Sequence, residues 1–219
     1  MTPRIGKAVE INALWCNALA ILASLYKFAG QKASAKRFAQ RTVQIRDRFR
    51  KKFWYAEGGY LYDCVDGEKR DTSIRPNQIF ALSLPYPLLE EQQARKVLEI
   101  VTEKLYTPFG LRSLAPEDPH YRPVYRGNSS ERDSAYHQGT VWGWLLGPWL
   151  TAMVRVNGQD GKATAQRYFK EIMPHLEDAG IGTISEIFDA EAPHAPRGCI
   201  AQAWSVAEIL RAYIEDLQD

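Results

Sequence analysis

Two kinds of helical stretch alternate along the chain, and this alternation restricts its possible folds more than any other feature. One kind is apolar around nearly its whole circumference, as expected for a helix that is buried on all sides. The other carries one apolar stripe among charged residues, which indicates an amphipathic outer helix. Inner helices surrounded by outer helices satisfy both patterns. The sequence therefore predicts an all-α fold built from helical hairpins.

The apolar stretches begin near residues 9, 76, 137 and 200, a spacing of roughly sixty residues that indicates an internal repeat. Short links lead from each apolar helix to the next amphipathic one, and long loops lead back, so the long loops should gather at one end. Pro148 is expected to kink the third apolar helix. The apolar helices are predicted at 9–29, 76–84, 137–156 and 199–214, and the amphipathic ones at 34–56, 90–105 and 161–178.

The long loops and the helix starts after them carry the polar and aromatic groups that bind sugars. A flat aromatic ring offers an apolar face to a sugar ring. Planar amides, carboxylates and guanidinium groups form paired hydrogen bonds with neighbouring hydroxyls. Each residue alone also has a structural explanation, such as a core tryptophan, and an open solenoid is the alternative fold. The predicted substrate-binding residues are Glu10, Asn12, Trp15, Asp71, Arg75, Asn77, Gln78, Tyr136, His137, Gln138, Trp142, Gln202 and Trp204.

One carboxylate stands out in the stretch from Gly182 to Asp189. Glu186 lies between Ile184 and the Ile187–Phe188 pair, so part of its surroundings should be dry. Such surroundings tune a carboxyl group for general acid or base chemistry. The alternative is a helix cap or a surface acid. The architecture around it favours Glu186 as the catalytic residue.

Composition excludes several classes of protein. The chain has 219 residues, 45% hydrophobic and 25% charged, with a net charge of +2, which is typical of one globular domain or most of one. The only basic cluster, at 46–52, should lie on a solvated helix face, so no nucleic-acid partner is predicted. No signal peptide is recognisable and no apolar run is expected to span a bilayer, so no membrane partner is predicted.

The cysteines and the short motifs give no sign of a metal or a cofactor. Cys16, Cys64 and Cys199 form an odd set without a close pair, which argues against a disulfide framework and a zinc cluster. A reducing cytoplasm is the predicted location. No phosphate-binding, dinucleotide-binding or metalloprotease motif is present, and no metal site or cofactor is predicted.

Six sequence motifs spread from end to end carry a family resemblance. They are Thr2–Lys7 with Val9–Trp15, Ile74–Gln78, Thr107–Arg112, Tyr136–Trp142, Gly182–Asp189 and Ala201–Ser205. In these motifs the chain resembles the C-terminal part of the glucosidase domain of bacterial and archaeal glycogen debranching enzymes. The resemblance implies an (α/α)6 toroid of six helical hairpins, shared in outline with glucoamylases and trehalases. Residues 1–219 would be its C-terminal portion, with about seven of twelve helices.

The same resemblance implies an activity. The family removes the α-1,6-linked glucose left at a glycogen branch and inverts the anomeric configuration. Its general base lies in the segment that matches Ser185–Glu186, so this role is expected of Glu186. Its general acid is an aspartate in an Asp-Ala-x-x-Trp type of motif, which this sequence lacks. The chain is therefore expected to be a piece that works with an N-terminal part of the same enzyme, or a truncated product. Glu10 is the alternative acid, although a substrate contact is the preferred role.

Other interpretations remain open beside this one. A different toroid glycosidase would act on a trehalose-like or maltose-like substrate, and a non-catalytic chain would serve as a carbohydrate-binding or interaction module. An incomplete toroid would also leave apolar helix flanks open to self-association. The flanks predicted to be open carry Trp15, Leu19, Leu22 and Leu25 at one end, and Trp204, Ile209 and Tyr213 at the other.

Overall fold

The computed structural model describes residues 4–218, which form two compact units. The N-terminal unit comprises Arg4–Thr72 and Asn77–Val97. The C-terminal unit comprises Ser73–Pro76 and residues 98–218. Thr2 and Pro3, which begin the first family-like motif, lie outside the described residues. Seven α-helices occur within the described chain, and short strands accompany them in both units.

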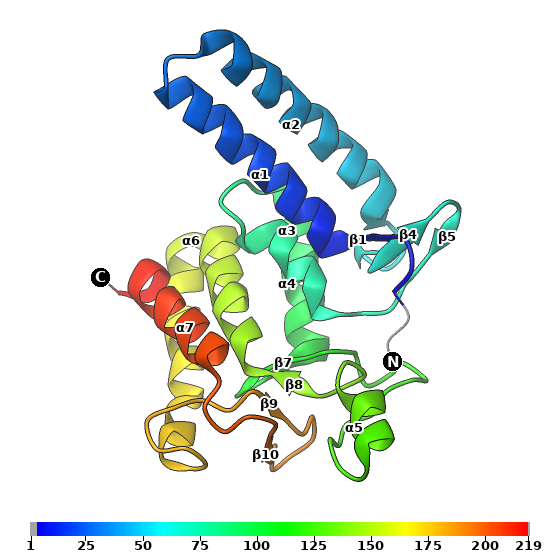
Figure 1. Cartoon of the computed structure of the whole chain (residues 1–219), viewed down its shortest axis with the longest axis vertical. Coiled ribbons are helices and arrows are strands. Elements are labelled where there is room, and N and C mark those ends of the chain that lie inside the picture. Colours follow the sequence, from blue (N-terminus) through cyan, green and yellow to red (C-terminus); the bar gives the residue numbers. More distant parts are fainter. Residues whose placement is uncertain (1–3, 219) are drawn as a thin grey trace. The chain divides into compact units, whose positions relative to one another are not determined.

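A helical hairpin dominates the N-terminal unit (Figure 1). Helix α1 (Val9–Phe28) and helix α2 (Lys32–Phe53) lie antiparallel, and Gly30 turns the chain between them at a φ of +73°. This left-handed backbone costs glycine little. The rings of Tyr26 and Phe38 stack across the hairpin with centroids 5.4 Å apart. The sequence predicted both helices, with ends that differ by up to three residues.

Helix α1 is buried on one side only, which corrects the expectation that it is buried all round. Val9, Ala13, Cys16, Leu19 and Ala20 are buried in the unit. The opposite face is exposed, and Phe28 is 94% exposed. The prediction that Leu19 lies on an open flank is therefore wrong, because Leu19 is buried. The exposed large apolar residues of α1 are Ile11, Leu14, Trp15, Ile21, Leu25 and Phe28.

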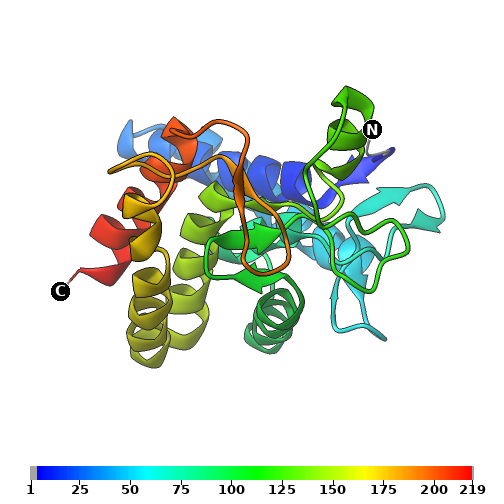
Figure 2. The same ribbon diagram turned by 90° about the horizontal axis from the view of Figure 1, so that it is seen from below.

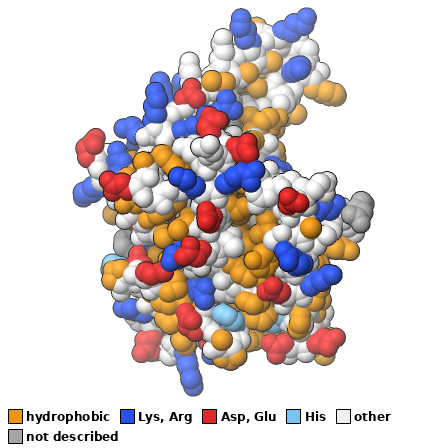
Figure 3. Space-filling model, turned by 180° about the vertical axis from the view of Figure 1, so that it is seen from behind, with side chains coloured by type: hydrophobic (Ala, Val, Ile, Leu, Met, Phe, Trp, Pro, Cys, Tyr) orange, Lys and Arg blue, Asp and Glu red, His pale blue; other side chains and the backbone are white. Residues whose placement is uncertain are grey.

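The length and composition of α1 correct another expectation. The helix is long and apolar enough to cross a membrane, whereas the sequence had suggested no run of that kind. Core helices of globular proteins and signal sequences near an N-terminus share these properties, so the finding is weak evidence of a membrane span. Figure 3 shows Lys and Arg side chains gathered at the upper end of one face, with apolar side chains beside them.

Two small antiparallel sheets also belong to the N-terminal unit, whereas the sequence predicted one possible strand, at 60–62, in a loop over 57–75. In the first, Ala8 pairs with Cys64 and Val65 pairs with Arg70. In the second, Trp54 pairs with Leu61. The strands are β1 (Lys7–Ala8), β4 (Cys64–Asp66) and β5 (Lys69–Arg70) in the first sheet, and β2 (Trp54–Tyr55) and β3 (Tyr60–Leu61) in the second.

The second predicted apolar helix is much shorter than the first. A 3-10 turn at Pro76–Ile79 leads into helix α3 (Phe80–Ser83). Pro76 opens the turn, where its missing N–H group has no partner to lose. Helix α4 (Glu91–Leu105) follows, with the predicted apolar stripe that includes Val97, Val101 and Leu105, all buried.

A five-stranded antiparallel sheet in the order β10-β9-β8-β7-β6 forms one part of the C-terminal unit. Its register places Leu111 opposite Trp142, and Trp142 opposite Ile187. Residues far apart in the sequence thus meet on neighbouring strands. The strands are β6 (Tyr106–Thr107), β7 (Gly110–Arg112), β8 (Val141–Trp142), β9 (Ile187–Phe188) and β10 (Pro196–Arg197).

Helices form the rest of the C-terminal unit. Helix α5 (Ser129–Ala135) was not predicted, and a reciprocal capping box between Asn128 and Glu131 starts it. Helix α6 (Leu146–Glu171) combines the two helices predicted at 137–156 and 161–178. Helix α7 (Ala203–Ala212) continues into a π-helical turn at Tyr213–Leu217.

The break in α6 lies at Gly158 and not at Pro148. Pro148 occupies the first turn of the helix, where proline is tolerated. Gly158 has a φ of +61° and a ψ of −135°, and the helix folds back on itself there. Figure 2 shows the two arms of α6 side by side. The third apolar helix also starts later than predicted, because residues 141–142 pair as a strand before the helix begins.

Candidate functional site

Glu186 directly precedes strand β9 in the C-terminal unit. Ile184, Ile187 and Phe188 around it are buried, whereas Glu186 itself is half-buried. Its N–H donates to the Cys199 carbonyl at 2.9 Å, and its own carbonyl accepts from Gly143 at 3.4 Å. The backbone is thus fixed on both sides, and the predicted mixture of dry and wet surroundings is present.

Two neutral donors hold the carboxylate of Glu186. The Tyr136 hydroxyl donates to Oε1, and the Cys199 backbone N–H donates to Oε2 at 2.9 Å. Gly198 lies directly beneath, at a φ of +67°, and a Cβ there would overlap Oε2. Glycine is thus required at 198 for the carboxylate to approach the backbone this closely. The carboxylate is oriented without a cation in these contacts.

Tyr136 connects Glu186 to a group of aromatic rings. Burial raises the pKa of the Tyr136 phenol well above its ordinary value, and the hydrogen bond to Glu186 raises it further. The phenol therefore stays a proton donor at neutral pH. Its ring lies 4.7 Å from that of Trp142 and 4.8 Å from that of His137. His137 and Trp142 stack at 5.1 Å with an interplanar angle of 7°.

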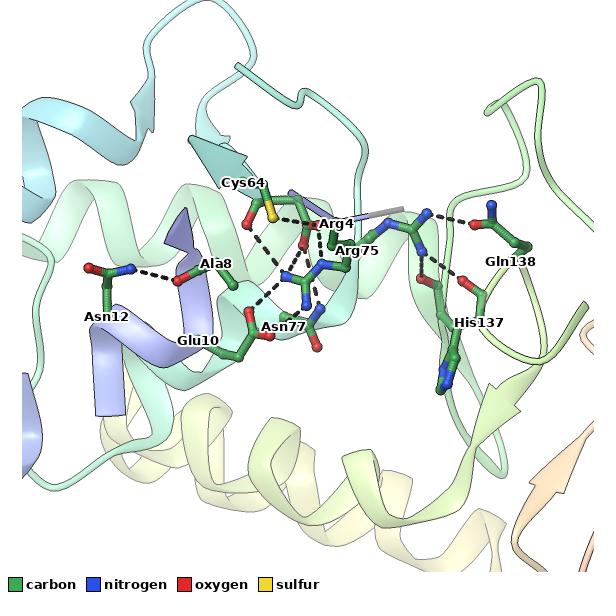
Figure 4. Close-up of polar contacts among 11 residues, drawn as sticks. Arg4, Ala8, Glu10, Asn12, Cys64, Arg75, Asn77, His137 and Gln138 are labelled. Atoms are coloured by element: carbon green, nitrogen blue, oxygen red, sulfur yellow. Dashed lines mark hydrogen bonds and ion pairs between the residues drawn. The ribbon is translucent and has the colours of Figure 1, made fainter. Parts of the chain in front are cut away.

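Arg75 braces the loop that supplies Tyr136 and His137. Its Nη1 donates to the carbonyls of Ser113 at 3.0 Å and His137 at 2.7 Å. Its Nη2 donates to Gln138 Oε1 at 2.6 Å (Figure 4). Arg75 is only 7% exposed, and these three hydrogen bonds hold the loop in place. Its predicted contact with substrate stays a prediction, as does that of Gln138.

A second aromatic pair lies at the start of helix α7. Trp204 stacks on Trp144 with ring centroids 4.0 Å apart and an interplanar angle of 16°. Trp204 is 52% exposed, so one of its faces is open to a flat ligand. Gln202 occupies the N-cap position of α7 without a side-chain capping bond, and its N–H donates to the Ile184 carbonyl at 2.9 Å. The structure thus brings the segments of Glu186, Gln202 and Trp204 together; their roles toward substrate stay predictions.

A separate charged group lies in the N-terminal unit. Arg4 donates to both oxygens of Glu10, at 2.6 and 2.8 Å, and to Asp63 Oδ2 at 2.6 Å and Oδ1 at 2.9 Å (Figure 4). Burial lowers the pKa of Arg4, but hydrogen bonds and attraction to Glu10 and Asp63 outweigh this and raise it above its ordinary value. Asn77 Nδ2 also donates to Asp63 Oδ1, at 3.4 Å.

The other predicted residues of this unit take up varied positions. Asn12 donates to the carbonyl of Ala8, the N-cap residue of its helix, at 2.8 Å, and Trp15 lies on the exposed face of α1. Gln78 is buried and accepts from the Leu61 N–H at 3.2 Å. Asp71 lies in the chain after β5, where its N–H donates to the Cys64 carbonyl at 3.0 Å. Their roles toward substrate stay predictions.

Sequence reasoning missed several residues of these two groups. Asp63 was not singled out, although it shares Arg4 with Glu10. Gly198 and Cys199 were missed because they act through backbone atoms, and any residue type can supply a backbone N–H. The Arg197-Gly198-Cys199 sequence signals only a turn. Within residues 4–218, no three His, Cys, Asp or Glu side chains gather as a metal site would require.

Solved structures share this fold at low sequence identity. A GH63 mannosylglycerate hydrolase from Thermus thermophilus matches with a TM-score of 0.68 and 18% identity, over 94% of this chain and 45% of that one. A sialidase structure matches with a TM-score of 0.77 and 16% identity, over 97% of this chain and 20% of that one. The predicted helical-hairpin glycosidase fold is thereby confirmed, with short sheets added to it.

Sequence comparison gives the family. The glycogen debranching enzyme of Saccharomyces cerevisiae is 30% identical over 185 residues, which cover 69% of this chain and 12% of the yeast protein. The chain thus spans about an eighth of that relative's length, and less than half of the solved chains it resembles. The profile of the amylo-alpha-1,6-glucosidase family matches residues 1–211. Since this match covers nearly the whole sequence, the protein belongs to the amylo-alpha-1,6-glucosidase family.

Proposed function

We propose that the chain contributes to a glycoside hydrolase that removes α-1,6-linked glucose at glycogen branch points by an inverting mechanism. Glu186 serves as the general base in this proposal. The observation that carries it is the carboxylate held by Tyr136 O–H and Cys199 N–H. Neutral donors orient a carboxylate while leaving its negative charge in place to accept a proton. Family membership supports the choice of reaction.

In this mechanism Glu186 takes a proton from a water molecule on the face of the sugar opposite the scissile bond. The water then attacks the anomeric carbon, and a second carboxyl group protonates the departing glycosidic oxygen. Inverting enzymes keep the two carboxyl groups roughly 6.5–9.5 Å apart to leave room for the water. The aromatic rings beside Tyr136 would offer a face to the glucose ring.

An inverting mechanism also needs a general acid. The printed sequence contains no Asp-Ala-x-x-Trp segment, and its relatives are much longer. We propose that an N-terminal part of the same enzyme supplies this acid. Glu10 remains the alternative, but its carboxylate is bound by Arg4 at both oxygens, an arrangement suited to a fixed contact. A role for Glu10 in binding glucan hydroxyls is the preferred one.

The test replaces Glu186 with glutamine in a debranching enzyme that carries this sequence. Glucose release from a branched limit dextrin is expected to fall about 10²–10⁴-fold, the usual contribution of a general base. Glu171→Gln is the matched control, because Glu171 also accepts from a tyrosine hydroxyl, that of Tyr106, at 2.7 Å. Wild-type hydrolysis by the Glu186→Gln enzyme would rule out the proposed base.

Two further measurements separate the alternatives. Cleavage of linear maltodextrin in preference to branched limit dextrin would indicate a different toroid glycosidase. A non-catalytic glucan-binding module is favoured by the missing Asp-Ala-x-x-Trp segment and by the exposed ring of Trp204. Binding of glucan by the isolated chain without release of glucose would support that module.

A further inference from the structure

A buried histidine lies directly behind the Glu186 segment. His175 belongs to the 3-10 turn at Met173–Glu177 and is 2% exposed. Its ring makes edge contacts with Phe188 at 4.8 Å and Phe109 at 5.8 Å. Phe188 belongs to strand β9, which begins directly after Glu186. His175 thus packs against the element that carries the proposed base, and the proposed mechanism leaves it without a role.

The hydrogen bonds of His175 define which ring nitrogen carries the proton. The backbone N–H of Ser185 donates to His175 Nε2 at 3.1 Å. Since an N–H group can only donate, Nε2 must be unprotonated and the neutral ring must carry its hydrogen on Nδ1. Nδ1 faces Asp178 Oδ2 at 3.5 Å, which suits that tautomer. Asp178 is the charged group with a described contact to this ring.

The order Asp178, His175 and Ser185 has the outline of a hydrolase triad, since Ser185 Oγ lies 3.2 Å from Nε2. A catalytic serine, however, must reach a substrate. Ser185 is only 1% exposed, and its N–H occupies the same ring nitrogen. The geometry therefore serves to hold the Ser185–Glu186 peptide in place.

We propose that His175 is a positioning residue for Glu186: its neutral ring accepts the Ser185 N–H and fixes the backbone from which the Glu186 side chain extends. This inference rests on the proposed function only for its consequence in catalysis. The hydrogen bond from the Ser185 N–H to His175 Nε2, here termed the anchor, is itself part of the described structure. Protonation of Nε2 would place two donors face to face and release Ser185, so the anchor is present only while the ring is neutral.

The pH range of the anchor follows from the burial of the ring. Burial lowers the pKa of His175 below the ordinary histidine value of 6.5, and Asp178 opposes this in part. The unfolded chain therefore takes up the proton at a higher pH than the folded chain does. The stability contributed by the neutral ring is fully present above about pH 6.5 and is lost progressively as the pH falls below it.

The experiment follows backbone amide signals of the whole 219-residue chain by NMR, from about pH 8 to about pH 5, where histidines titrate. The amides of Ser185 and Cys199 are expected to shift together, with the midpoint of His175 and below pH 6.5. Cys199 is informative because its N–H donates to Glu186 Oε2. His120 is the internal control: it also contacts an aspartate, Asp118 at 3.2 Å, but is 75% exposed.

Variants sharpen the same experiment. His175→Gln keeps an acceptor and should hold the two amide signals near their neutral-pH positions throughout, whereas His175→Phe removes the acceptor and should displace both at every pH. His120→Gln should leave the wild-type transition unchanged. In a debranching enzyme that carries this sequence, His175→Phe should lower kcat about 100-fold with little change in KM, the effect of a misplaced catalytic group.

The outcomes separate the anchor from the proposed function. If Ser185 and Cys199 show no transition at the midpoint of His175 in the wild-type chain, the anchor is refuted, even if His175→Phe fails to fold. The role of Glu186 as base would then still stand on the Glu186→Gln test. If Glu186→Gln retains hydrolysis while the amides shift as expected, the base is refuted and the anchor stands.

Discussion

Two glutamates of this chain are held in opposite ways. In the C-terminal unit, Glu186 accepts from a phenol and a backbone N–H. In the N-terminal unit, Glu10 accepts twice from the guanidinium of Arg4, which also binds Asp63. Neutral donors orient a carboxylate without cancelling its charge, whereas a guanidinium orients it and compensates its charge at once. The first arrangement suits a group that must accept a proton, and the second suits a group that must stay fixed.

The two groups also differ in what their loss should cost. The Arg4 group is an ion-pair network around Asp63, whose side chain is 1% exposed, so its removal should act on folding. The Glu186 group consists of single hydrogen bonds around a half-buried side chain, so its removal should act mainly on catalysis. Each prediction below tests one side of this contrast.

The largest effect is expected from Arg4→Met. The change leaves Asp63 buried without its cation, and breaking such a pair typically costs about 3–5 kcal/mol. The free energy of unfolding, measured by urea titration, should fall by that amount. Arg95→Met is the control, because the Arg95–Glu91 pair is exposed at 52% and 75% and should contribute less than about 0.5 kcal/mol. Equal losses in the two variants would refute a structural role for the Arg4 group.

Gly198→Ala should have the next largest effect, on catalysis. The new Cβ would overlap Glu186 Oε2 and displace the carboxylate, which is expected to lower kcat about 100-fold. Gly30→Ala provides the matched control. Gly30 has a similar φ of +73°, but a Cβ there would have no heavy atom within 4 Å, so Gly30→Ala carries the backbone cost without the overlap. A similar kcat in both variants would show that the close approach at Gly198 is unnecessary.

Tyr136→Phe should have a smaller effect, because Cys199 N–H still holds Oε2. Loss of one hydrogen bond to a charged group costs about 1.5–3 kcal/mol. Since part of this loss falls on folding, kcat is expected to fall about tenfold, equivalent to about 1.4 kcal/mol. Steady-state glucose release measures the change. Tyr106→Phe removes the same kind of bond, to Glu171, and should leave kcat unchanged. An unchanged kcat in Tyr136→Phe would remove Tyr136 from the site.

The sequence predicted the helices better than the connections between them. Helices α2 and α4 appear almost where their periodicity placed them, because burial of one face determines both pattern and structure. Helix α1 appears where its apolar run placed it. Residues 141–142 were assigned to an apolar helix over 137–156, but they form strand β8 and pair with β7 and β9. A short apolar run does not distinguish a buried strand from a buried helix. Partners distant in sequence decide between them.

The residues of the candidate site also differ in how well the sequence predicted them. Glu186 stood out for its apolar neighbours, and Tyr136 and Trp142 for side chains that suit sugar binding; the structure places the three in one group. Cys199 and Gly198 act through a backbone N–H and through the absence of a Cβ, neither of which leaves a mark in the sequence. The anchor of His175 depends on a fold in which residues 175 and 185 meet. Spacing alone does not reveal such a meeting.

The two units also differ in how many large apolar side chains they expose, and this difference should have the smallest effect. The sequence predicted open flanks at Trp15, Leu19, Leu22 and Leu25, and at Trp204, Ile209 and Tyr213. Of these residues, Leu19 and Ile209 are buried. Of the large apolar residues, six are exposed on α1, and four are exposed from Trp204 to Ile214: Trp204, Leu210, Tyr213 and Ile214.

We therefore expect the isolated chain to self-associate, with α1 contributing more than α7. Leu25→Ala and Leu210→Ala form a matched pair, because the two leucines are 58% and 53% exposed. Leu25→Ala should weaken association by about 1 kcal/mol, or about fivefold in the dissociation constant, from the apolar surface it removes. Leu210→Ala should weaken it less, because fewer large apolar residues are exposed from Trp204 to Ile214 than on α1. Size-exclusion chromatography with light scattering over a dilution series measures both. A wild-type monomer at every concentration, with no binding of a hydrophobic dye, would contradict the open faces as association surfaces.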